Sequence, residues 1–548
     1  MLFNSLEFFA FFGLVYGLYV VLPFRHQNTL LLLAGYTFYG WWDVRFLFLI
    51  AFSTTVDFWI GLMLSEGRVS SQQRTISSAF ILIAAFLFLF VDWQHLVSWQ
   101  FTDFNAIFRF NDPVALSALA ASAAFVVLTS LTHDRIAQLS VDHRRRLMLF
   151  VTVFVNLSFL GIFKYFNFFI DSANAIITSL GWNAGSFHLH VVLPVGISFY
   201  TFQSLSYTID VSRGMVKPTR RLQDFALFVA YFPPMVAGPI ERARHLLPQL
   251  LEPRRIRLKQ VVHGLLLILF GLFKKVGIAD GIAVAVNSVY NSTGAVSASD
   301  VLLATVLFAV QIFCDFSGYT DIARGISKLI GIELLVNFRL PYFSKNPSEF
   351  WRRWHISLSS WLRDYLYISL GGNKKGEGRT YFNLMATMTL GGLWHGAAWN
   401  FVLWGVYQGV LLCVHRFFSG HVFSNKTTLK GSENRLAGAL KIAFFFVFIC
   451  YGWLLFRANS FDQIVLFTQT IVGFGASGVP SVLPRPPIGA LLGIMLLAVL
   501  QIVEHMDGRA EVLRYLPKPL QGAVLAMVIV ILVMGTSNVP AQFIYFQF

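Results

Sequence analysis

The sequence predicts an all-α integral membrane protein with many spans, on three observations. Of 548 residues, 56% are hydrophobic and only 13% are charged, whereas soluble domains carry about 25% charged residues. The mean hydropathy is +0.64. Apolar runs of roughly 17 to 25 residues recur along the chain, the length that a helix needs to cross a bilayer core. A soluble core cannot bury this much apolar surface, so the excess is expected to face lipid.

The apolar runs give the expected spans in order. They lie at residues 6–23, 28–42, 44–64, 76–91, 114–131, 147–163, 191–210, 259–278, 300–317, 383–411, 438–456, 486–504 and 519–536. No sizeable soluble domain separates them, so residues 1–548 are expected to form one membrane domain. Its expected parts are N-terminal spans over about 1–190, a motif-bearing core over 191–420 and C-terminal spans over 421–548.

The first run is expected to be a retained helix, because residues 1–22 lack the basic start and small-residue cleavage site of a signal peptide. Basic residues follow alternate spans, and such loops are usually cytoplasmic. These residues are Arg25, Arg68, Arg74, Arg135, Arg144, Arg145, Arg146, Arg213, Lys217, Arg220 and Arg221. The N-terminus is therefore expected outside.

Residues 222–240 are expected to enter the membrane and return on the same side. A full crossing would place the basic run from Arg242 to Lys259 outside, against the charge pattern. Pro233 and Pro234 interrupt the segment, and consecutive prolines break a helix. Broken backbone at membrane depth is tolerated where protein surrounds it.

Composition also excludes several classes of site. The net charge of +15 comes from short basic segments between apolar runs, and no separate basic domain for nucleic acid is present. The three cysteines lie in apolar runs without paired or metal-ligand spacing, and no HExxH or comparable histidine set occurs. Neither a disulfide framework nor a metal site is predicted.

The run 383–412 contains one residue that titrates near neutral pH, His395. An ionisable residue inside a membrane span predicts a functional site, and histidine can serve as a general base. Gly392 and Gly396 are expected to let another helix approach. Three further side chains could shape and hydrogen-bond a pocket: Trp394, Trp399 and Asn400. The alternative is a core histidine bonded to a neighbouring carbonyl.

Residues 349–370 are too polar to span and are expected to form an amphipathic interfacial helix. At about 100° per residue, its apolar face collects Trp351, Trp354, Leu358, Trp361 and Tyr365. The opposite face collects Arg353, Ser357, Ser360 and Asp364. His355 lies at the border, where it could reach both a buried cavity and an aqueous ligand. The alternative is a helix that only rests among lipid headgroups.

Three arginines of this helix, Arg352, Arg353 and Arg363, could bind the phosphates of an anionic cofactor. In residues 313–325, Asp315 follows an apolar run and Tyr319 lies one turn beyond it. A carboxylate there must be paired, hydrated or protonated. Asp315 has two possible roles. It could be functional, by orienting a histidine or accepting a hydrogen bond from substrate, or it could be structural. Asp321 and Arg324 predict a local ion pair.

Five stretches together resemble the membrane-bound O-acyltransferase family, in particular its alginate O-acetylating branch. They are PVGISFYTFQSLSYTIDVSRG (194–214), AGPIERARHLLPQL (237–250), DFSGYTDIARGI (315–326), NFRLPYFSKNPSEFWRRWHISLSSWLRDYLYISLGGNKKG (337–376) and LGGLWHGAAWNFVLWG (390–405). The resemblance is weaker over the N-terminal spans and thin after about residue 460. It implies the helical bundle of that family, with re-entrant and interfacial helices.

The resemblance also implies the activity. An acyl group would pass from a cytoplasmic thioester donor, acetyl-CoA, to an extracellular or periplasmic polysaccharide such as an alginate- or cellulose-like polymer. The family's two functional histidines match His355 in WRRWHISLS and His395 in LWHG. His395 would be general base or acyl carrier, with His355 and Asn400 positioning or polarising the carbonyl. The site would also include Asp315, Tyr319, Arg352, Arg353, Arg363, Asp364 and Trp394. The resemblance implies a location in the bacterial inner membrane and a partner that is an extracytoplasmic acetyltransferase. It implies no metal cofactor.

Two departures keep other substrates open. An extra pair of spans near 76–131 interrupts the alginate pattern, and the AGPIERA stretch is closer to relatives with other substrates. A peptidoglycan O-acetylation or teichoic-acid D-alanylation component is the alternative within the class. A polysaccharide transporter or channel is the alternative outside it, and would predict inverted repeats and paired charges along a path.

Overall fold

The computed structural model describes residues 1–97, 107–182, 188–189, 192–419, 434–474, 479–535 and 543–544. These residues are mainly helical, and among them the only strand-like pairing is an isolated bridge between Val91 and Phe108. Nine helices in the described ranges are long and apolar enough to cross a membrane. The prediction of an all-α protein with many membrane spans is confirmed.

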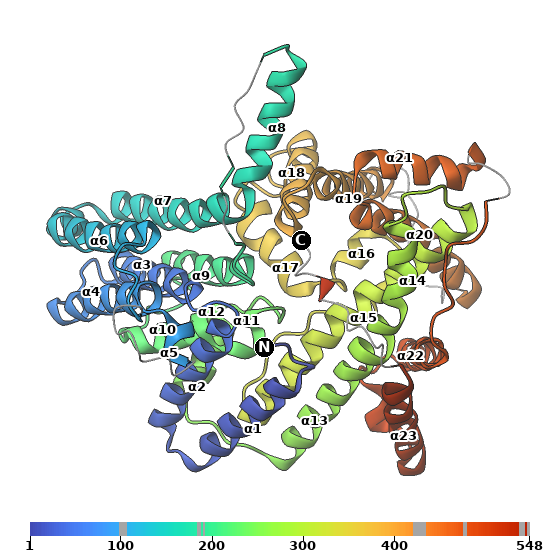
Figure 1. The fold of residues 1–548 in the computed structure, drawn as a ribbon, viewed down its shortest axis with the longest axis horizontal. Coiled ribbons are helices and arrows are strands. Elements are labelled where there is room, and N and C mark those ends of the chain that lie inside the picture. The colour runs from blue at the N-terminus through green and yellow to red at the C-terminus, as the bar shows by residue number, and fades with distance from the viewer. Residues whose placement is uncertain are drawn as a thin grey trace. The chain divides into compact units, whose positions relative to one another are not determined.

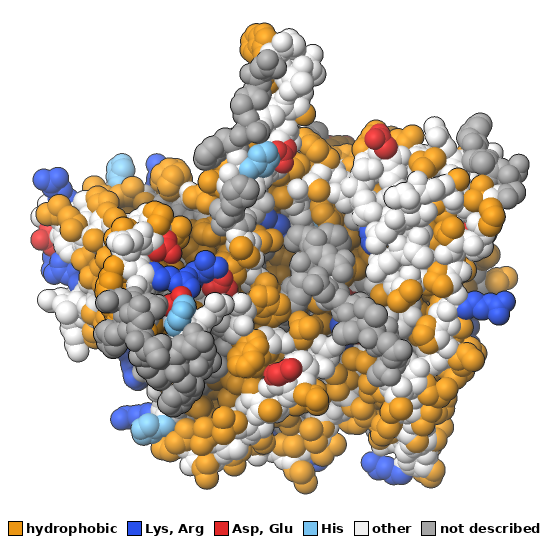
Figure 2. All heavy atoms as spheres, viewed as in Figure 1, with side chains coloured by type: hydrophobic (Ala, Val, Ile, Leu, Met, Phe, Trp, Pro, Cys, Tyr) orange, Lys and Arg blue, Asp and Glu red, His pale blue; other side chains and the backbone are white. Residues whose placement is uncertain are grey.

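The chain folds into two compact units. Unit 1 comprises Met1–Val261 and Ile326–Leu334, and unit 2 comprises Val262–Gly325 and Leu335–Phe548. Hydrophobic side chains cover much of the face drawn in Figure 2. On α22 (Ile488–Asp507) and α23 (Lys518–Gly535), the exposed hydrophobic residues include Met495, Ile502, Met527 and Val533. Apolar surface of this extent is expected to contact lipid.

Unit 1 contains the first twelve α-helices (Figure 1). They are α1 (Leu6–Val21), α2 (Phe24–Gly40), α3 (Phe46–Ser65), α4 (Ser71–Ala85), α5 (Trp93–Val97), α6 (Pro113–Ala137), α7 (Val141–Leu160), α8 (Phe166–Ser179), α9 (Ile197–Ser212), α10 (Leu222–Ala230), α11 (Phe232–Met235) and α12 (Ala243–Leu251). Helices α4 and α6 occupy the two runs near 76–131. The expected span 147–163 is part of a longer helix, Val141–Ser179, which changes direction at the π-helical turn Gly161–Tyr165.

The most buried candidate span of unit 1 is α3, and it carries a carboxylate that the sequence reasoning missed. Asp57 is fully buried. Its carboxylate accepts hydrogen bonds from Thr152 Oγ1 at 2.7 Å and from Asn156 Nδ2 at 3.1 Å, both on α7. Buried charges persist where such partners surround them, so this cluster ties α3 to α7.

Residues 222–240 form no crossing helix. Helix α10 has nine residues, so it is only about 13 Å long against a bilayer core of about 30 Å. It ends at Tyr231 (ψ 106°), and the four-residue α11 contains Pro233 and Pro234. Residues 225–240 are all buried, and Gln223 and Asp224 are half-buried, so protein surrounds the broken backbone, as a re-entrant segment requires.

Unit 2 contains the remaining helices, except that α13 begins and α15 ends with residues of unit 1. They are α13 (Leu258–Leu272), α14 (Asp280–Tyr290), α15 (Ala298–Ile330), α16 (Pro347–Trp351), α17 (Ile356–Trp361), α18 (Glu377–His395), α19 (Trp399–Phe417), α20 (Arg435–Arg457), α21 (Phe461–Gln469), α22 (Ile488–Asp507) and α23 (Lys518–Gly535). The prediction of one span over 383–411 is wrong, since α18 and α19 are separate helices that pack on each other. The prediction of one continuous helix over 349–370 is also wrong, because the helix is broken before His355.

Candidate active site

His355 lies at the break between α16 and α17. Its backbone has φ 42° and ψ 54°, the left-handed region that residues other than glycine rarely adopt. A right-handed helix cannot continue through such a residue. The two residues that follow are held by Asn337: Ile356 N–H donates to its main-chain oxygen at 2.9 Å and Ser357 N–H donates to its Oδ1 at 3.2 Å.

His395 is the last residue of α18, and the chain is extended at Gly396 (φ −162°, ψ 153°). Helices α18 and α19 approach closely through Gly392 and Gly405. A Cβ on Gly392 would lie 2.8 Å from Gly405 Cα and closer still to the carbonyl oxygen of Phe401. The expectation of close helix packing at Gly392 is confirmed, whereas Gly396 lies beyond the helix and faces the ring of Phe401.

The structure brings the two histidines together. Their ring centroids are 6.4 Å apart, with 49° between the ring planes. His355 is 0% exposed and His395 is 4% exposed. The expectation that His355 lies at a polar border is therefore wrong, because the turn before α17 directs this side chain inward. Aromatic rings line the pair: Phe316 lies 4.7 Å from His355, and Trp404 and Phe456 lie 5.1 and 5.4 Å from His395.

Burial decides the charge state of His355. Desolvation lowers the pKa of His355 from 6.5 to about 3, because a low-dielectric environment disfavours the imidazolium. His355 is therefore neutral throughout the physiological range. A neutral imidazole presents one N–H donor and one nitrogen acceptor, which can polarise a carbonyl or orient a hydroxyl beside a second histidine.

Two other predicted site residues on α18 and α19 differ in their surroundings. The ring of Trp394 lies 5.1 Å from His395 and 6.0 Å from His355, so it borders the pair. Asn400 instead donates through Nδ2 to the carbonyl oxygens of Phe456 and Ala458, at 3.2 and 3.0 Å. These oxygens belong to the C-terminal end of α20, so the Asn400 amide nitrogen ties α19 to α20.

Asp315 belongs to a buried charge cluster. Lys275 Nζ lies 2.8 Å from Asp315 and 2.7 Å from Asp280, and all three side chains are at most 4% exposed. The second Asp315 oxygen accepts from Ile544 N–H at 2.7 Å. Tyr319 is buried one turn on, with its ring 4.1 Å from that of Phe543. Asp315 is thus paired, as its burial requires, and residues 543–544 pack on the helix face that carries it.

Two of the three arginines expected to bind phosphates are paired with carboxylates. Arg353 pairs with Glu349 at 2.5 Å, and Arg363 pairs with Asp364 at 2.7 Å. The Asp364 carboxylate raises the pKa of Arg363. Arg352 is exposed and donates to the main-chain oxygen of Ser348. Arg352 is therefore the one of the three whose guanidinium has no carboxylate partner among the described residues.

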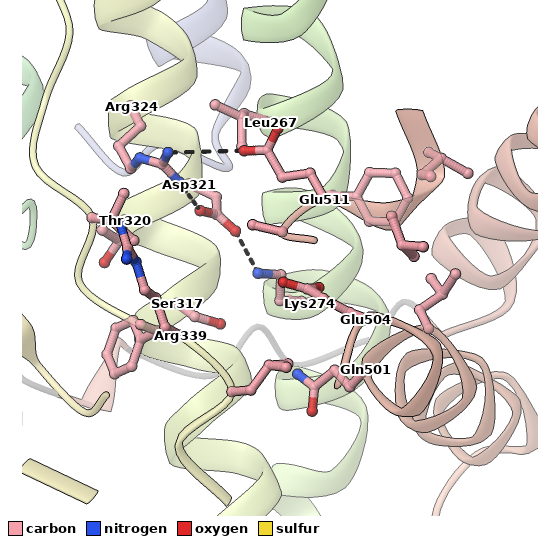
Figure 3. A pocket seen from close by; sticks show the side chains of 18 of the residues that line it. Leu267, Lys274, Ser317, Thr320, Asp321, Arg324, Arg339, Gln501, Glu504 and Glu511 are labelled. Atoms are coloured by element: carbon pink, nitrogen blue, oxygen red, sulfur yellow. Dashed lines mark hydrogen bonds and ion pairs between the residues drawn. The ribbon is translucent and has the colours of Figure 1, made fainter. Parts of the chain in front are cut away.

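A pocket of about 250 Å³ lies in unit 2 between α13, α15, α22 and residues 336–340. Figure 3 draws its charged side chains. Asp321 pairs with Lys274 and, at 3.1 Å, with Arg324, which confirms the predicted local ion pair. Glu511 lies 2.7 Å from His263. The lining also includes Asn337, Arg339, Leu497 and Leu500.

Several residues beside the histidines were missed by the sequence reasoning. Asn337, Phe316, Trp404 and Phe456 come from four other segments, and helical periodicity gives no signal for contacts between segments. Lys275 was also missed, although an intramembrane lysine is itself a signal. Within the described ranges, no group of three or more His, Cys, Asp or Glu residues is arranged to hold a metal ion.

Comparison with known proteins identifies the family. The profile of the membrane-bound O-acyltransferase family matches residues 217–460. The probable alginate O-acetylase AlgI of Azotobacter vinelandii is 37% identical over 478 residues, which cover 87% of this chain and 79% of the relative. The peptidoglycan O-acetyltransferase of Helicobacter pylori is 33% identical, covering 65% and 70%. The teichoic acid D-alanyltransferase of Bacillus subtilis is 30% identical, covering 49% and 70%. The chain therefore belongs to the membrane-bound O-acyltransferase family and is an O-acyltransferase.

Proposed function

We propose that this enzyme moves an acetyl group from cytoplasmic acetyl-CoA across the membrane, by transfer to an acceptor hydroxyl, for O-acetylation of an extracytoplasmic polysaccharide, of which alginate is the first candidate. The observation that carries the proposal is the pair of buried histidines, 6.4 Å apart, on the two segments that match the family's histidine motifs. The alginate candidate is supported by the A. vinelandii relative, which covers more of this chain than the peptidoglycan or teichoic acid relatives do.

In the proposed reaction, His395 is the general base. Its ring nitrogen takes the proton of the acceptor hydroxyl while the oxygen attacks the thioester carbon. The C–S bond then breaks, and the CoA thiolate receives the proton from the His395 imidazolium. The neutral His355 hydrogen-bonds the carbonyl oxygen as negative charge develops on it. In the alternative route, His395 first accepts the acyl group on nitrogen and then transfers it to the hydroxyl.

For the remaining predicted residues, we propose two places for the negatively charged part of the donor. Arg352 is exposed and unpaired with any carboxylate in the described part of the chain. The pocket beside Asn337 offers a second place, because the exposed Arg339 lines it without an ion-pair partner among the described residues. The turn around His355 is proposed to be stabilised by the ion pairs of Arg353, Arg363 and Asp364. Trp394 is proposed to form one wall of the site. Asp315 and Tyr319 support that wall through α15.

The proposed location is the bacterial inner membrane, with the donor bound from the cytoplasm. The acceptor lies outside, so an extracytoplasmic acetyltransferase is the proposed partner that passes the group to the polymer. This partner would be recovered with the enzyme by affinity purification in mild detergent.

The experiment is mass spectrometry of the extracellular polysaccharide from cells that carry the wild-type gene, no gene or His395→Ala. We expect O-acetyl groups only with the wild type. His415→Ala is the matched control, because His415 lies on α19 outside the histidine pair and bonds Ser419. Full acetylation by a folded His395→Ala enzyme would refute the assignment. Loss of acetyl or D-alanyl groups from cell wall with an unchanged exopolysaccharide would select the peptidoglycan or teichoic acid alternative.

A further inference from the structure

We infer that Asn337 is a positioning residue, which holds His355 in its left-handed backbone conformation and thereby aims the imidazole at His395. The inference rests on the proposed role of His355. Asn337 lies 18 positions before His355 in the chain.

Two loop segments, residues 336–340 and the turn between α16 and α17, meet at this point. Arg339 N–H donates to the Arg353 carbonyl at 3.0 Å, and Ile356 N–H donates to the Asn337 carbonyl at 2.9 Å. These two main-chain bonds are on opposite sides of His355. The third bond, from Ser357 N–H to Asn337 Oδ1 at 3.2 Å, is the one that depends on the identity of the side chain at 337.

The third bond takes the place of a helix cap. The first N–H groups of a helix have no partner within it, and the side chain of the N-cap residue usually supplies one. His355 is the N-cap residue of α17 and makes no capping bond. Asn337 caps α17 in its place. The imidazole is thereby directed to the ring cluster, where it lies 4.7 Å from Phe316 and 6.4 Å from His395.

The other end of the Asn337 amide also points to a role beyond packing. Asn337 is 1% exposed, and its Nδ2 has no hydrogen-bond partner among the described residues. It lines the pocket of Figure 3, as does the buried Ser317, whose Oγ is likewise without a partner there. A buried donor without a partner costs stability. An apolar residue would avoid that cost, but it could not hold Ser357.

The test compares Asn337→Leu with Asn337→Asp in the full-length enzyme. Leucine removes the acceptor for Ser357, whereas aspartate retains an oxygen at that position. We expect Asn337→Leu to lower kcat about 100-fold, the effect of misplacing a catalytic group by about 1 Å. Asn337→Asp should recover at least about a tenth of the wild-type kcat. Equal losses in the two variants, or a loss confined to KM, would overturn the inference.

Asn383→Leu is the matched control. Asn383 is also fully buried and donates through Nδ2 to a main-chain oxygen, that of Gly372, but it does not contact the His355 turn. We expect this variant to keep its kcat. A loss as large as that of Asn337→Leu would show that any buried asparagine of unit 2 has the same effect, and would contradict a positioning role.

A second measurement uses stability in place of catalysis. It tests whether Asn337 holds the backbone of His355 even if His355 has no role in acyl transfer. Glycine adopts the left-handed conformation without support. Asn337→Leu should therefore lower the melting temperature of the wild type more than that of the His355→Gly variant. Equal shifts in the two backgrounds would refute the positioning of His355. Full activity of His355→Ala would refute only the proposed function.

Discussion

Replacement of Gly392 by alanine tests the packing that places His395. The new Cβ would lie 2.8 Å from Gly405 Cα and 2.9 Å from Gly405 N, with the Phe401 carbonyl oxygen nearer still. Ordinary contact begins at 3.4 Å, and all of these are backbone atoms that cannot rotate away. Helices α18 and α19 must then separate by about 1 Å, since close-packed interiors leave no room for the methyl group. His395 is less than one turn from Gly392 and must move with α18.

The magnitude follows from two opposing effects. Alanine favours a helix over glycine by up to about 1 kcal/mol, whereas overpacking costs about 1–3 kcal/mol. We therefore expect a net loss of about 1–2 kcal/mol in the free energy of unfolding. A displacement of about 1 Å at a catalytic group should also lower kcat about 100-fold.

Gly391→Ala is the control at the adjacent position of the same helix. Its Cβ would meet only Leu362 Cδ1, at 3.0 Å, and that methyl group is the end of a flexible side chain. We expect this variant to be at least as stable as the wild type and nearly as active. The assays are thermal unfolding in detergent and transfer of labelled acetyl groups to polysaccharide. If Gly392→Ala matched Gly391→Ala in both assays, the packing argument would be refuted.

Three further predictions concern the charged and strained residues of unit 2. His355→Gly should be more stable than His355→Ala by about 1–2 kcal/mol, the cost of the left-handed conformation for a residue with a Cβ; equal melting temperatures would contradict the strain. Because the folded pKa of His355 lies near 3 and its ordinary value is 6.5, the unfolded state binds more protons between these values. Stability present above pH 6.5 is then lost as pH falls, by about 2 kcal/mol at pH 5. His355→Gln should lack this loss in melting curves at pH 7 and 5, and parallel curves would contradict the assigned pKa. Lys275→Met should cost about 3–5 kcal/mol, because Asp280 and Asp315 remain buried without their cation. Lys274→Met should cost less, since Arg324 still pairs with Asp321; equal losses would contradict the paired cluster.

The sequence predicted the class of fold because hydrophobic length is a local property. Runs such as residues 44–64 and 519–536 correspond closely to α3 and α23. The run 383–411 was interpreted as one span for the same reason, since Gly396, Ala397 and Ala398 are apolar and give no charge or proline signal for a turn. The turn exists because Gly392 and Gly405 let α18 and α19 pack face to face, which is a tertiary effect.

The candidate site was predictable residue by residue but not in its geometry. Of the five residues of the expected apolar face of 349–370, Trp354, Leu358, Trp361 and Tyr365 are buried and Trp351 is half-buried, but Ser357 of the expected polar face is buried too. Helical periodicity placed His355 at the border of that face, and it assumed an unbroken helix. The break depends on Asn337, 18 residues earlier, and no local pattern reports such a bond. The ion pairs of Arg353 with Glu349 and of Arg363 with Asp364 join residues that are four and one positions apart. Both pairs could have been predicted from the sequence.

The site carries two separate costs on one residue. The left-handed backbone of His355 costs about 1–2 kcal/mol, and its burial removes the stabilisation that hydration gives an imidazolium. An asparagine at 355 would adopt the same backbone as readily, and a leucine would tolerate the aromatic surroundings better, so neither conformation nor packing explains a histidine. What only histidine provides there is a neutral ring with both a donor and an acceptor, 6.4 Å from a second imidazole. That combination is useful for holding a carbonyl beside a base, which is the step that acyl transfer requires.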